Sequence, residues 1–183
     1  MDVFDAIFGR RSIRDYENDD IPDSVIYKAI DAARHAPSAG NFQPWEFIIV
    51  RDAQIKKKLY SAAFSQSQIL SAPVVIVVCA DVMRSAYYGI RGTNLYAIQD
   101  TAAAIQNMLL AFYAMGYGTC WVGAFSEQAV RECLNLPSEV RPVAIITVGK
   151  PREKPDKREL RSIEEIVHFD LWGNKSPEFS EHS

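Results

Sequence analysis

The sequence predicts one domain of the α/β or α+β class, in which helices cover a small sheet. Four short apolar runs resemble strands, and about five segments with helical spacing of apolar residues lie around them. The chain has 183 residues, 48% of them hydrophobic and 23% charged, which is a balance typical of a globular protein with a buried core. No internal repeat or linker divides it, so we expect residues 1–183 to form a single domain.

Two helices and a strand are predicted in the first part of the chain. Apolar residues recur at helical spacing over residues 3–9, which indicates a short first helix. A second helix over residues 23–33 has Asp23 or Ser24 as its expected N-cap. The apolar run at 45–50 predicts the first strand.

The middle of the chain contains the strongest strand and helix signals. A helix is predicted over about residues 52–64, and a strand over 73–79 that is apolar throughout and therefore central in the sheet. Residues 81–92 have no clear period, and we expect a mobile loop there. The helix predicted over 93–115 is apolar nearly all round, which indicates burial in a core or against a partner chain.

The last part of the chain is predicted to complete the sheet and to end in an arm. Residues 119–122 form a short strand, Ser126 caps a helix that ends near Leu134, and 142–148 form the last strand. Residues 152–161 are charged and extended. We expect residues 163–183 to lie across a neighbouring subunit, because they carry several large apolar side chains: Ile166, Phe169, Leu171, Trp172 and Phe179.

Charge and cysteine content limit the classes of partner. The chain has 20 Lys+Arg against 23 Asp+Glu, and this net charge of -3 argues against nonspecific nucleic-acid binding. The 3 cysteines form no CxxC pair, which favours a reducing compartment. The start of the chain has no apolar signal stretch, and no run has the length to span a bilayer. We therefore expect a cytoplasmic protein with neither nucleic acid nor membrane as partner.

The usual catalytic motifs are missing from the sequence. It contains no GxSxG, HExxH, P-loop or GxGxxG motif, and its 3 histidines have no metal-binding spacing, so no metal site is expected. His35 lies where the second helix ends, and a helix cap is its favoured role. Asp100, Gln106 and Asn107 lie in the long apolar helix and need partners across a helix or subunit contact. No catalytic side chain is predicted, which is compatible with chemistry carried by a cofactor.

Three segments favour a cofactor site. The cluster Arg10–Arg14 offers guanidinium forks for a phosphate, although a solvated helix end would explain the same cluster. The loop Pro37–Asn41 offers backbone donors and a small profile for a flat ring. The turn Val122–Ala124 exposes backbone amides beside residues with almost no side chain.

These segments belong to blocks that resemble the nitroreductase superfamily, a group of FMN-dependent oxidoreductases, here of the short, single-domain type. The most specific block is APSAGNFQPWEF at Ala36–Phe47, and the others follow in the same order as in the family. These others are Arg10–Tyr16, Ala72–Ile76, Gly116–Gly123 and Glu164–His168. The resemblance implies an α+β fold with a central, mainly antiparallel sheet flanked by helices. It also implies an intertwined homodimer with FMN at the interface.

The resemblance assigns cofactor-binding roles to individual residues. It implies phosphate and ribityl contacts from one subunit through Arg10, Arg11, Ser12 and Arg14. From the other subunit it implies a loop against the flavin ring made by Pro37, Ser38, Ala39 and Asn41, preceded by His35. It further implies a backbone amide near the flavin N5 at Gly123 and Ala124, a ring-edge contact at Gln66, and a phosphate contact at Arg158. Leu160 departs from the family pattern, where a second cation is common, and Lys157 or Arg161 is the alternative.

The implied activity is that of an FMN-dependent NAD(P)H oxidoreductase. NADH or NADPH would give hydride to the flavin, and a small-molecule acceptor such as a nitroaromatic or quinone would then enter the same cleft. One alternative is a specialised relative, namely a reductive dehalogenase, an enoate-type reductase or a flavin-fragmenting enzyme, with substrate-binding residues in segment 81–92. Another is an FMN-binding protein without turnover.

Overall fold

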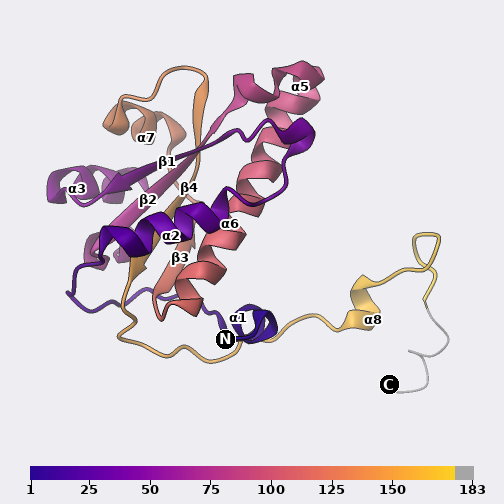
Figure 1. The fold of residues 1–183 in the computed structure, drawn as a ribbon, viewed down its shortest axis with the longest axis horizontal. Helices are drawn as coiled ribbons and strands as arrows, with labels where there is room; N and C mark the ends of the chain where they lie inside the picture. The colour runs from indigo at the N-terminus through magenta and orange to yellow at the C-terminus, as the bar shows by residue number, and fades with distance from the viewer. Residues whose placement is uncertain (176–183) are drawn as a thin grey trace.

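The structure, a computed structural model, describes residues 1–175 of the chain (Figure 1). Its centre is a 4-stranded sheet with the order β1-β2-β4-β3, in which all neighbouring strands are antiparallel. The strands are β1 (Trp45–Val50), β2 (Val74–Asp81), β3 (Gly118–Val122) and β4 (Val140–Gly149). The α+β class and the antiparallel sheet are therefore confirmed, as is the central position of β2.

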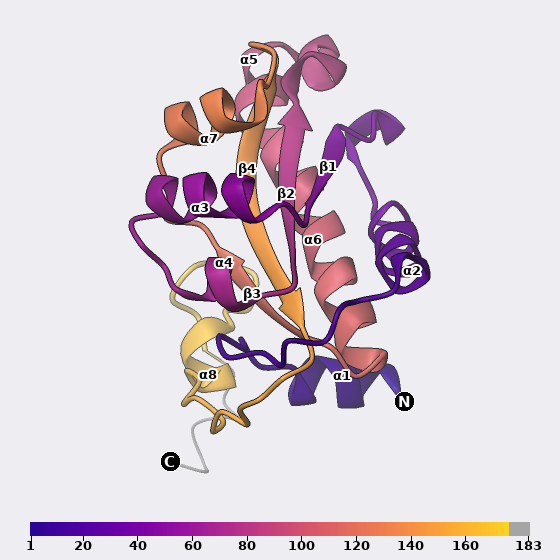
Figure 2. The same ribbon diagram turned by 90° about the vertical axis from the view of Figure 1, so that its left-hand side faces the viewer.

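Alternation along β2 explains why the sheet is covered on both faces. Val74, Ile76 and Val78 pack with α2 (Asp23–Ala33) and α6 (Ala97–Ala114), whereas the residues between them pack toward the opposite side. That opposite layer consists of α3 (Ala53–Ala62), α4 (Gln68–Ser71) and α7 (Glu127–Leu134). Figure 2 shows the two helical layers on either side of the sheet.

Most predicted elements are present, and the segment after β2 is the main correction. The sequence predicts a loop over residues 81–92, but these residues form the 3₁₀ helix η2 (Val82–Tyr88) and the short helix α5 (Gly89–Arg91). The π-helical turn η3 (Gly92–Tyr96) follows, so α6 begins at Ala97 rather than at 93. Turns of three different periods in succession leave no single hydrophobic period in the sequence.

The two predicted helix caps have different outcomes. The side chain of Ser126 accepts a hydrogen bond from the backbone N–H of Ala129, which confirms it as the N-cap of α7. Neither Asp23 nor Ser24 caps α2, because Pro22 occupies the N-cap position and makes no side-chain bond to the helix. Proline is tolerated at a helix start because no intrahelical bond requires its missing N–H there.

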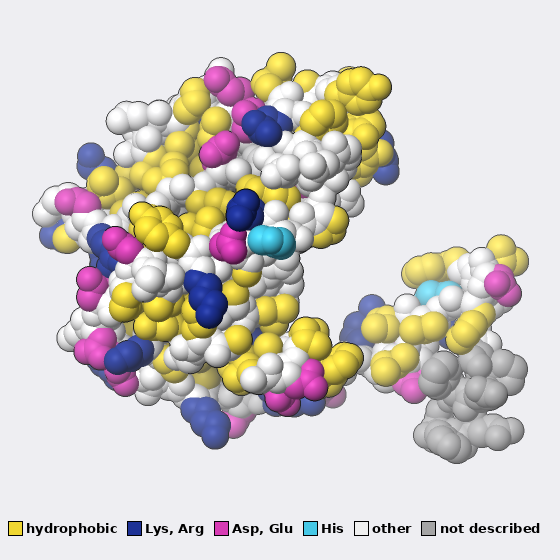
Figure 3. Space-filling model, viewed as in Figure 1, with side chains coloured by type: hydrophobic (Ala, Val, Ile, Leu, Met, Phe, Trp, Pro, Cys, Tyr) yellow, Lys and Arg dark blue, Asp and Glu magenta, His cyan; other side chains and the backbone are white. Residues whose placement is uncertain are grey.

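The two ends of the chain leave apolar side chains uncovered. Helix α1 (Val3–Gly9) exposes Val3, Phe4 and Phe8. Beyond residue 155 the chain extends away from the body as an arm that contains α8 (Ile163–Ile166) (Figures 1 and 3). The exposed apolar residues of this arm are Leu160, Ile163, Ile166, Phe169, Leu171 and Trp172. Phe179 lies outside the described residues, and packing of the arm on a partner stays a prediction.

Within residues 1–175, no helix is long and apolar enough to cross a membrane.

Tyr16 attaches the segment after α1 to the sheet. Its side chain is 1% exposed, and its hydroxyl donates to the carbonyl of Ile13 and lies 2.7 Å from Oγ1 of Thr147 on β4. Burial raises the pKa of this hydroxyl well above its usual range. The ring therefore fixes the path of residues 10–16 relative to β4.

Removal of this hydroxyl should weaken the fold. We expect Tyr16→Phe to lower the free energy of unfolding by about 1–2 kcal/mol, because buried polar partners lose a hydrogen bond. Urea unfolding followed by circular dichroism measures the change. Tyr60→Phe is the matched control, since Tyr60 is half-buried and its hydroxyl makes no hydrogen bond within the described residues. Equal midpoints for the two variants would contradict the anchoring role of Tyr16.

Candidate functional site

The arginine cluster leaves α1 as an extended segment beside β3. Ser12 forms a parallel bridge with Thr119, and the backbone N–H of Ile13 donates to the carbonyl of Thr119 at 2.9 Å. In an extended segment successive side chains point to opposite sides. The alternation therefore divides the cluster into two groups.

Arg11 and Ile13 lie on one side of this segment. Both line a hollow of about 410 Å³ together with Tyr113 of α6. The Arg11 guanidinium donates to the carbonyls of Phe8 and Arg10 at 2.7 and 2.8 Å. These contacts cap the C-terminal end of α1, where a cation is also favoured by the helix dipole. Arg11 is thus separated from the other arginines, and its predicted phosphate contact stays a prediction.

Arg10 and Arg14 lie on the other side, close to Cys120 of β3. Burial raises the pKa of the Cys120 thiol, and the charges of Arg14 and Arg10 partly oppose that shift. Arg14 is exposed and Ser12, between the two arginines, is half-buried. Two guanidinium groups with a hydroxyl between them offer an anion a set of strong donors.

Two glutamines connect these arginines with the turn after β3. Gln68, which is 6% exposed, lies beside Cys120 and donates from Nε2 to Oε1 of Gln66 at 3.3 Å. Gln66 in turn donates from Nε2 to the carbonyl of Ala124 at 2.9 Å. The arginines, the glutamines and the turn therefore form one connected set of neighbouring residues around Cys120. Sequence reasoning misses Gln68, because its local pattern does not distinguish it from a surface glutamine of a short helix.

The turn at Gly123 is open. A Cβ built on this residue would have Nε1 of Trp121, at 3.9 Å, as its nearest neighbour, and Gly123 has no left-handed φ. The fold itself thus does not require glycine at this position. Because Gly123 has no side chain, a ligand can approach the backbone closely at this turn. Gly123 also lines a hollow of about 350 Å³ with Asn94 and Arg141.

The loop after α2 packs against α6, away from the arginines. Its 3₁₀ turn η1 (Ala39–Asn41) is connected to α6 through the Ala39 N–H, which donates to both carboxylate oxygens of Asp100 at 3.2 Å. The Ser38 hydroxyl accepts from the backbone N–H of Gln43 at 3.1 Å. The partner that the sequence predicts for Asp100, across a helix or subunit contact, is therefore this loop of the same chain.

A second polar residue of α6 behaves as predicted. Asn107 donates from Nδ2 to the Ala32 carbonyl of α2 at 3.2 Å, which confirms its helix–helix contact. Gln106, one position earlier, is exposed. The polar residues of the long helix thus have separate roles, and Asp100 is the one of these three that bonds the loop.

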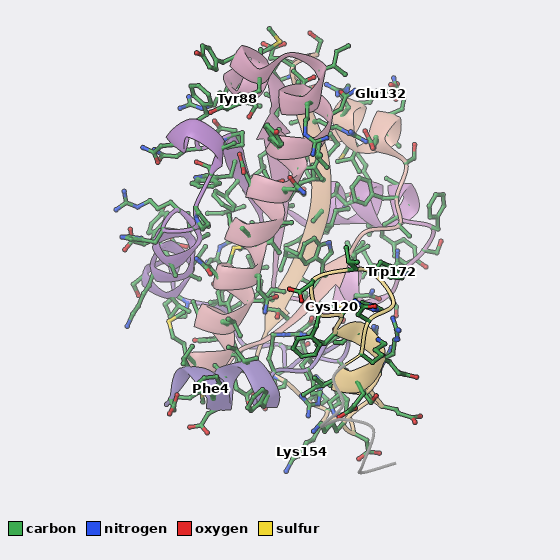
Figure 4. The ribbon with its side chains drawn as sticks, turned by 90° about the vertical axis from the view of Figure 1, so that its right-hand side faces the viewer. Phe4, Tyr88, Cys120, Glu132, Lys154 and Trp172 are labelled. Carbon is green, nitrogen blue, oxygen red and sulfur yellow. The ribbon has the colours of Figure 1, made fainter. Side chains whose placement is uncertain are left out.

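Helix α6 separates the loop from the arginines. Asp100 lies in its first turn, whereas the end of α1 packs against Tyr113 near its last turn. The helix rises about 1.5 Å per residue, so these two positions are about 20 Å apart. Figure 4 shows Tyr88, which borders the loop, and Phe4 of α1 at opposite ends of the molecule. One chain therefore carries two half-sets of the predicted residues and does not bring them together.

The remaining predicted residues are His35, which precedes the loop, and the basic residues of the arm. His35 is exposed at the end of α2 and donates from Nδ1 to the carbonyl of Asp31 at 2.7 Å, which confirms its role at the helix end. Lys157 and Arg158 are exposed on the arm, and Arg161 pairs with Glu165 at 3.6 Å. In the part of the chain that the structure describes, no group of three His, Cys, Asp or Glu residues is arranged to hold a metal.

The start of the arm is nevertheless fixed beside the arginines. The Glu153 carboxylate accepts from the backbone N–H groups of Arg14 and Asp15, and Arg152 pairs with Asp15 at 3.6 Å. The backbone N–H of Arg152 also donates to the Asp15 carbonyl at 3.0 Å. The basic residues further along the arm thus begin from a point close to Arg14.

Comparison with known proteins relates this geometry to a family. The model of the Nitroreductase family matches residues 7–71 and 62–150. An NADH dehydrogenase of Thermus thermophilus is 32% identical over 200 residues, covering 94% of this chain and 96% of its own. An NAD(P)H-dependent FMN reductase of Bacillus subtilis is 28% identical over 188 residues, covering 95% of this chain and 76% of its own. The crystal structure of a nitroreductase family protein from Clostridium novyi NT is 30% identical, with a TM-score of 0.77 and coverage of 96% of this chain and 97% of that chain.

Proposed function

The chain belongs to the nitroreductase family, and on that premise we propose that it is an FMN-dependent oxidoreductase that uses NADH or NADPH. The observation that carries the proposal is the connected set of neighbouring residues from Arg10 and Arg14, past Gln68 and Gln66, to the open turn at Gly123. It offers donors for a phosphate at one end and room for a flat ring at the other. FMN has both groups.

The donor set fits the phosphate end of FMN. Arg10 and Arg14 would hold phosphate oxygens with paired N–H donors, and the Ser12 hydroxyl would add a neutral hydrogen bond. Arg14 is exposed, so it can turn toward a ligand without loss of a packed position. Arg158, with Lys157 or Arg161, would complete the phosphate site from the arm.

The Gly123 turn fits the ring end. The backbone N–H at Gly123 or Ala124 would donate to the ring, and this donor is already oriented by the strand that precedes it. FMN, when bound, would supply the redox chemistry between NAD(P)H and a nitroaromatic, a quinone or a similar acceptor. The chain has to bind and orient these molecules, which agrees with the absence of an acid–base motif in the sequence.

A second copy of the chain would complete the site. The loop of Pro37, Ser38, Ala39 and Asn41 is about 20 Å from the arginines along α6, so one FMN can contact both sets only if two chains combine. The arm and α1 also expose apolar side chains that a monomer would leave in water. Both observations support a homodimer in which the arm lies on the partner.

The proposed activity is tested by titration with FMN followed by anaerobic reduction. We expect the protein to bind FMN, its visible absorbance to bleach on addition of NADH, NADPH or both, and the absorbance to return when an acceptor is added. Stopped-flow absorbance measures each step. A protein that binds no FMN would contradict the proposal. Bound FMN that neither nicotinamide reduces would instead indicate a binding protein without turnover.

The phosphate assignment has its own test. We expect Arg14→Ala and Ser12→Ala each to raise the dissociation constant for FMN, by about tenfold or more for Arg14, because a charge-assisted hydrogen bond is lost. The free energy of unfolding should not change for Arg14→Ala, since that side chain is exposed. Fluorescence titration and urea unfolding measure the two quantities. Lys57→Ala, which removes an exposed cation of α3, is the matched control, and FMN affinity equal to this control would remove Arg14 from the site.

The homodimer is tested through the arm. Leu171 and Trp172 are 70% and 90% exposed in the single chain. We expect their double change to serine to raise the dimer dissociation constant by about tenfold or more, because large apolar anchors dominate interfaces. Sedimentation equilibrium measures that constant. Met83→Ser, at a residue 61% exposed outside the arm, is the control. A monodisperse monomer with full FMN content is the result that excludes the shared site.

A further inference from the structure

Several residues of the loop after α2 have an unfavourable backbone conformation. Gly40, Asn41 and Gln43 have φ values of 57°, 58° and 50°, all in the left-handed region. Glycine adopts this region freely, but Asn41 and Gln43 do so at a cost in free energy. Such a run persists only where surrounding contacts determine it. The contacts that hold the loop therefore decide its conformation.

Contacts on one side of the loop come from η2 and η3. The Arg84 Nε donates to the Phe42 carbonyl at 2.8 Å. The Tyr88 ring packs edge-on against Phe42 and Tyr96, with centroids 5.8 and 5.4 Å apart. A Cβ on Gly40 would come within 2.9 Å of the Tyr88 hydroxyl, so the loop and this aromatic ring are in close contact.

The contact from α6 is Asp100. Asp100 is 8% exposed, in a helix otherwise rich in apolar residues, and both its carboxylate oxygens accept from the Ala39 N–H. Burial raises its pKa, and the hydrogen bond from Ala39 opposes that shift. A buried carboxylate is costly for the fold, and a neutral residue would avoid that cost. Its only side-chain hydrogen-bond partner among the described residues is the loop.

We propose that Asp100 is a positioning residue that holds the loop Ser38–Asn41 from α6, in the conformation that meets the flavin ring. The proposal rests on the proposed function for its ligand and on the Ala39 contact for its geometry. Asp100 acts through the loop and does not touch the cofactor. Without this acceptor the loop would occupy its binding conformation less often, and the apparent FMN affinity would fall in proportion.

Three variants separate this role from a general effect on the fold. Asp100→Ala removes the acceptor, whereas Asp100→Asn keeps an oxygen that can accept from the Ala39 N–H. Thr101→Val is the matched control, because Thr101 is a buried polar neighbour whose hydroxyl bonds the Ala97 and Ile98 carbonyls of its own helix. Two quantities are measured: hydrogen exchange of segment 38–43 in the FMN-free protein, and the dissociation constant for FMN.

We expect Asp100→Ala to speed exchange of segment 38–43 by about tenfold or more, as for loss of one hydrogen bond to a charged group. The FMN dissociation constant should rise by the factor by which the binding conformation of the loop loses population. Asp100→Asn should stay within about threefold of the natural protein in both measurements, because it keeps the acceptor. Thr101→Val should match the natural protein in both.

Two results would overturn the role of Asp100. One is exchange in Asp100→Ala equal to that in Thr101→Val, and the other is an Asp100→Asn variant as impaired as Asp100→Ala. A natural protein that binds no FMN would overturn the proposed function instead. In that case the exchange rates would still decide whether Asp100 holds the loop.

Discussion

The rigid helix α6 is the constraint on which the rest of the structure depends. It packs against α2 and the sheet and contacts α1 near its last turn. Because an α-helix of 18 residues has a fixed length, it sets the distance between the loop held at one end and the arginines near the other. The two half-sets lie apart in one chain, and this separation is what supports the proposal of a site shared by two chains.

The sheet and the main helices are predictable because their patterns are local and regular. The uninterrupted apolar run of β2 indicates burial on both faces, and Ser126 is followed by a helix that its side chain caps. Segment 82–96 is not predictable in this way, because 3₁₀, α and π turns follow one another there. Aromatic contacts such as that between Tyr88 and Tyr96 stabilise these turns, and such contacts have no signature in a local period.

The candidate site is predictable as a set of segments but not as an arrangement. Sequence alone groups Arg11 with Arg10 and Arg14, and only the extended path beside β3 separates it from them. Gln68 and Asp100 depend on neighbours that are far away in the sequence, namely Cys120 and Ala39. A buried polar residue in an apolar helix does indicate that a partner exists, but the sequence does not identify that partner.

The surroundings of the cysteines have a consequence for oxidation. Burial raises the pKa of all three thiols, to about 12 for Cys79, and Cys120 stays protonated although two arginines lie near it. Peroxides and disulfides react with the thiolate and not with the thiol. All three thiols are therefore poor nucleophiles toward peroxides and disulfides, and this includes Cys120, which lies beside the arginines of the proposed phosphate site.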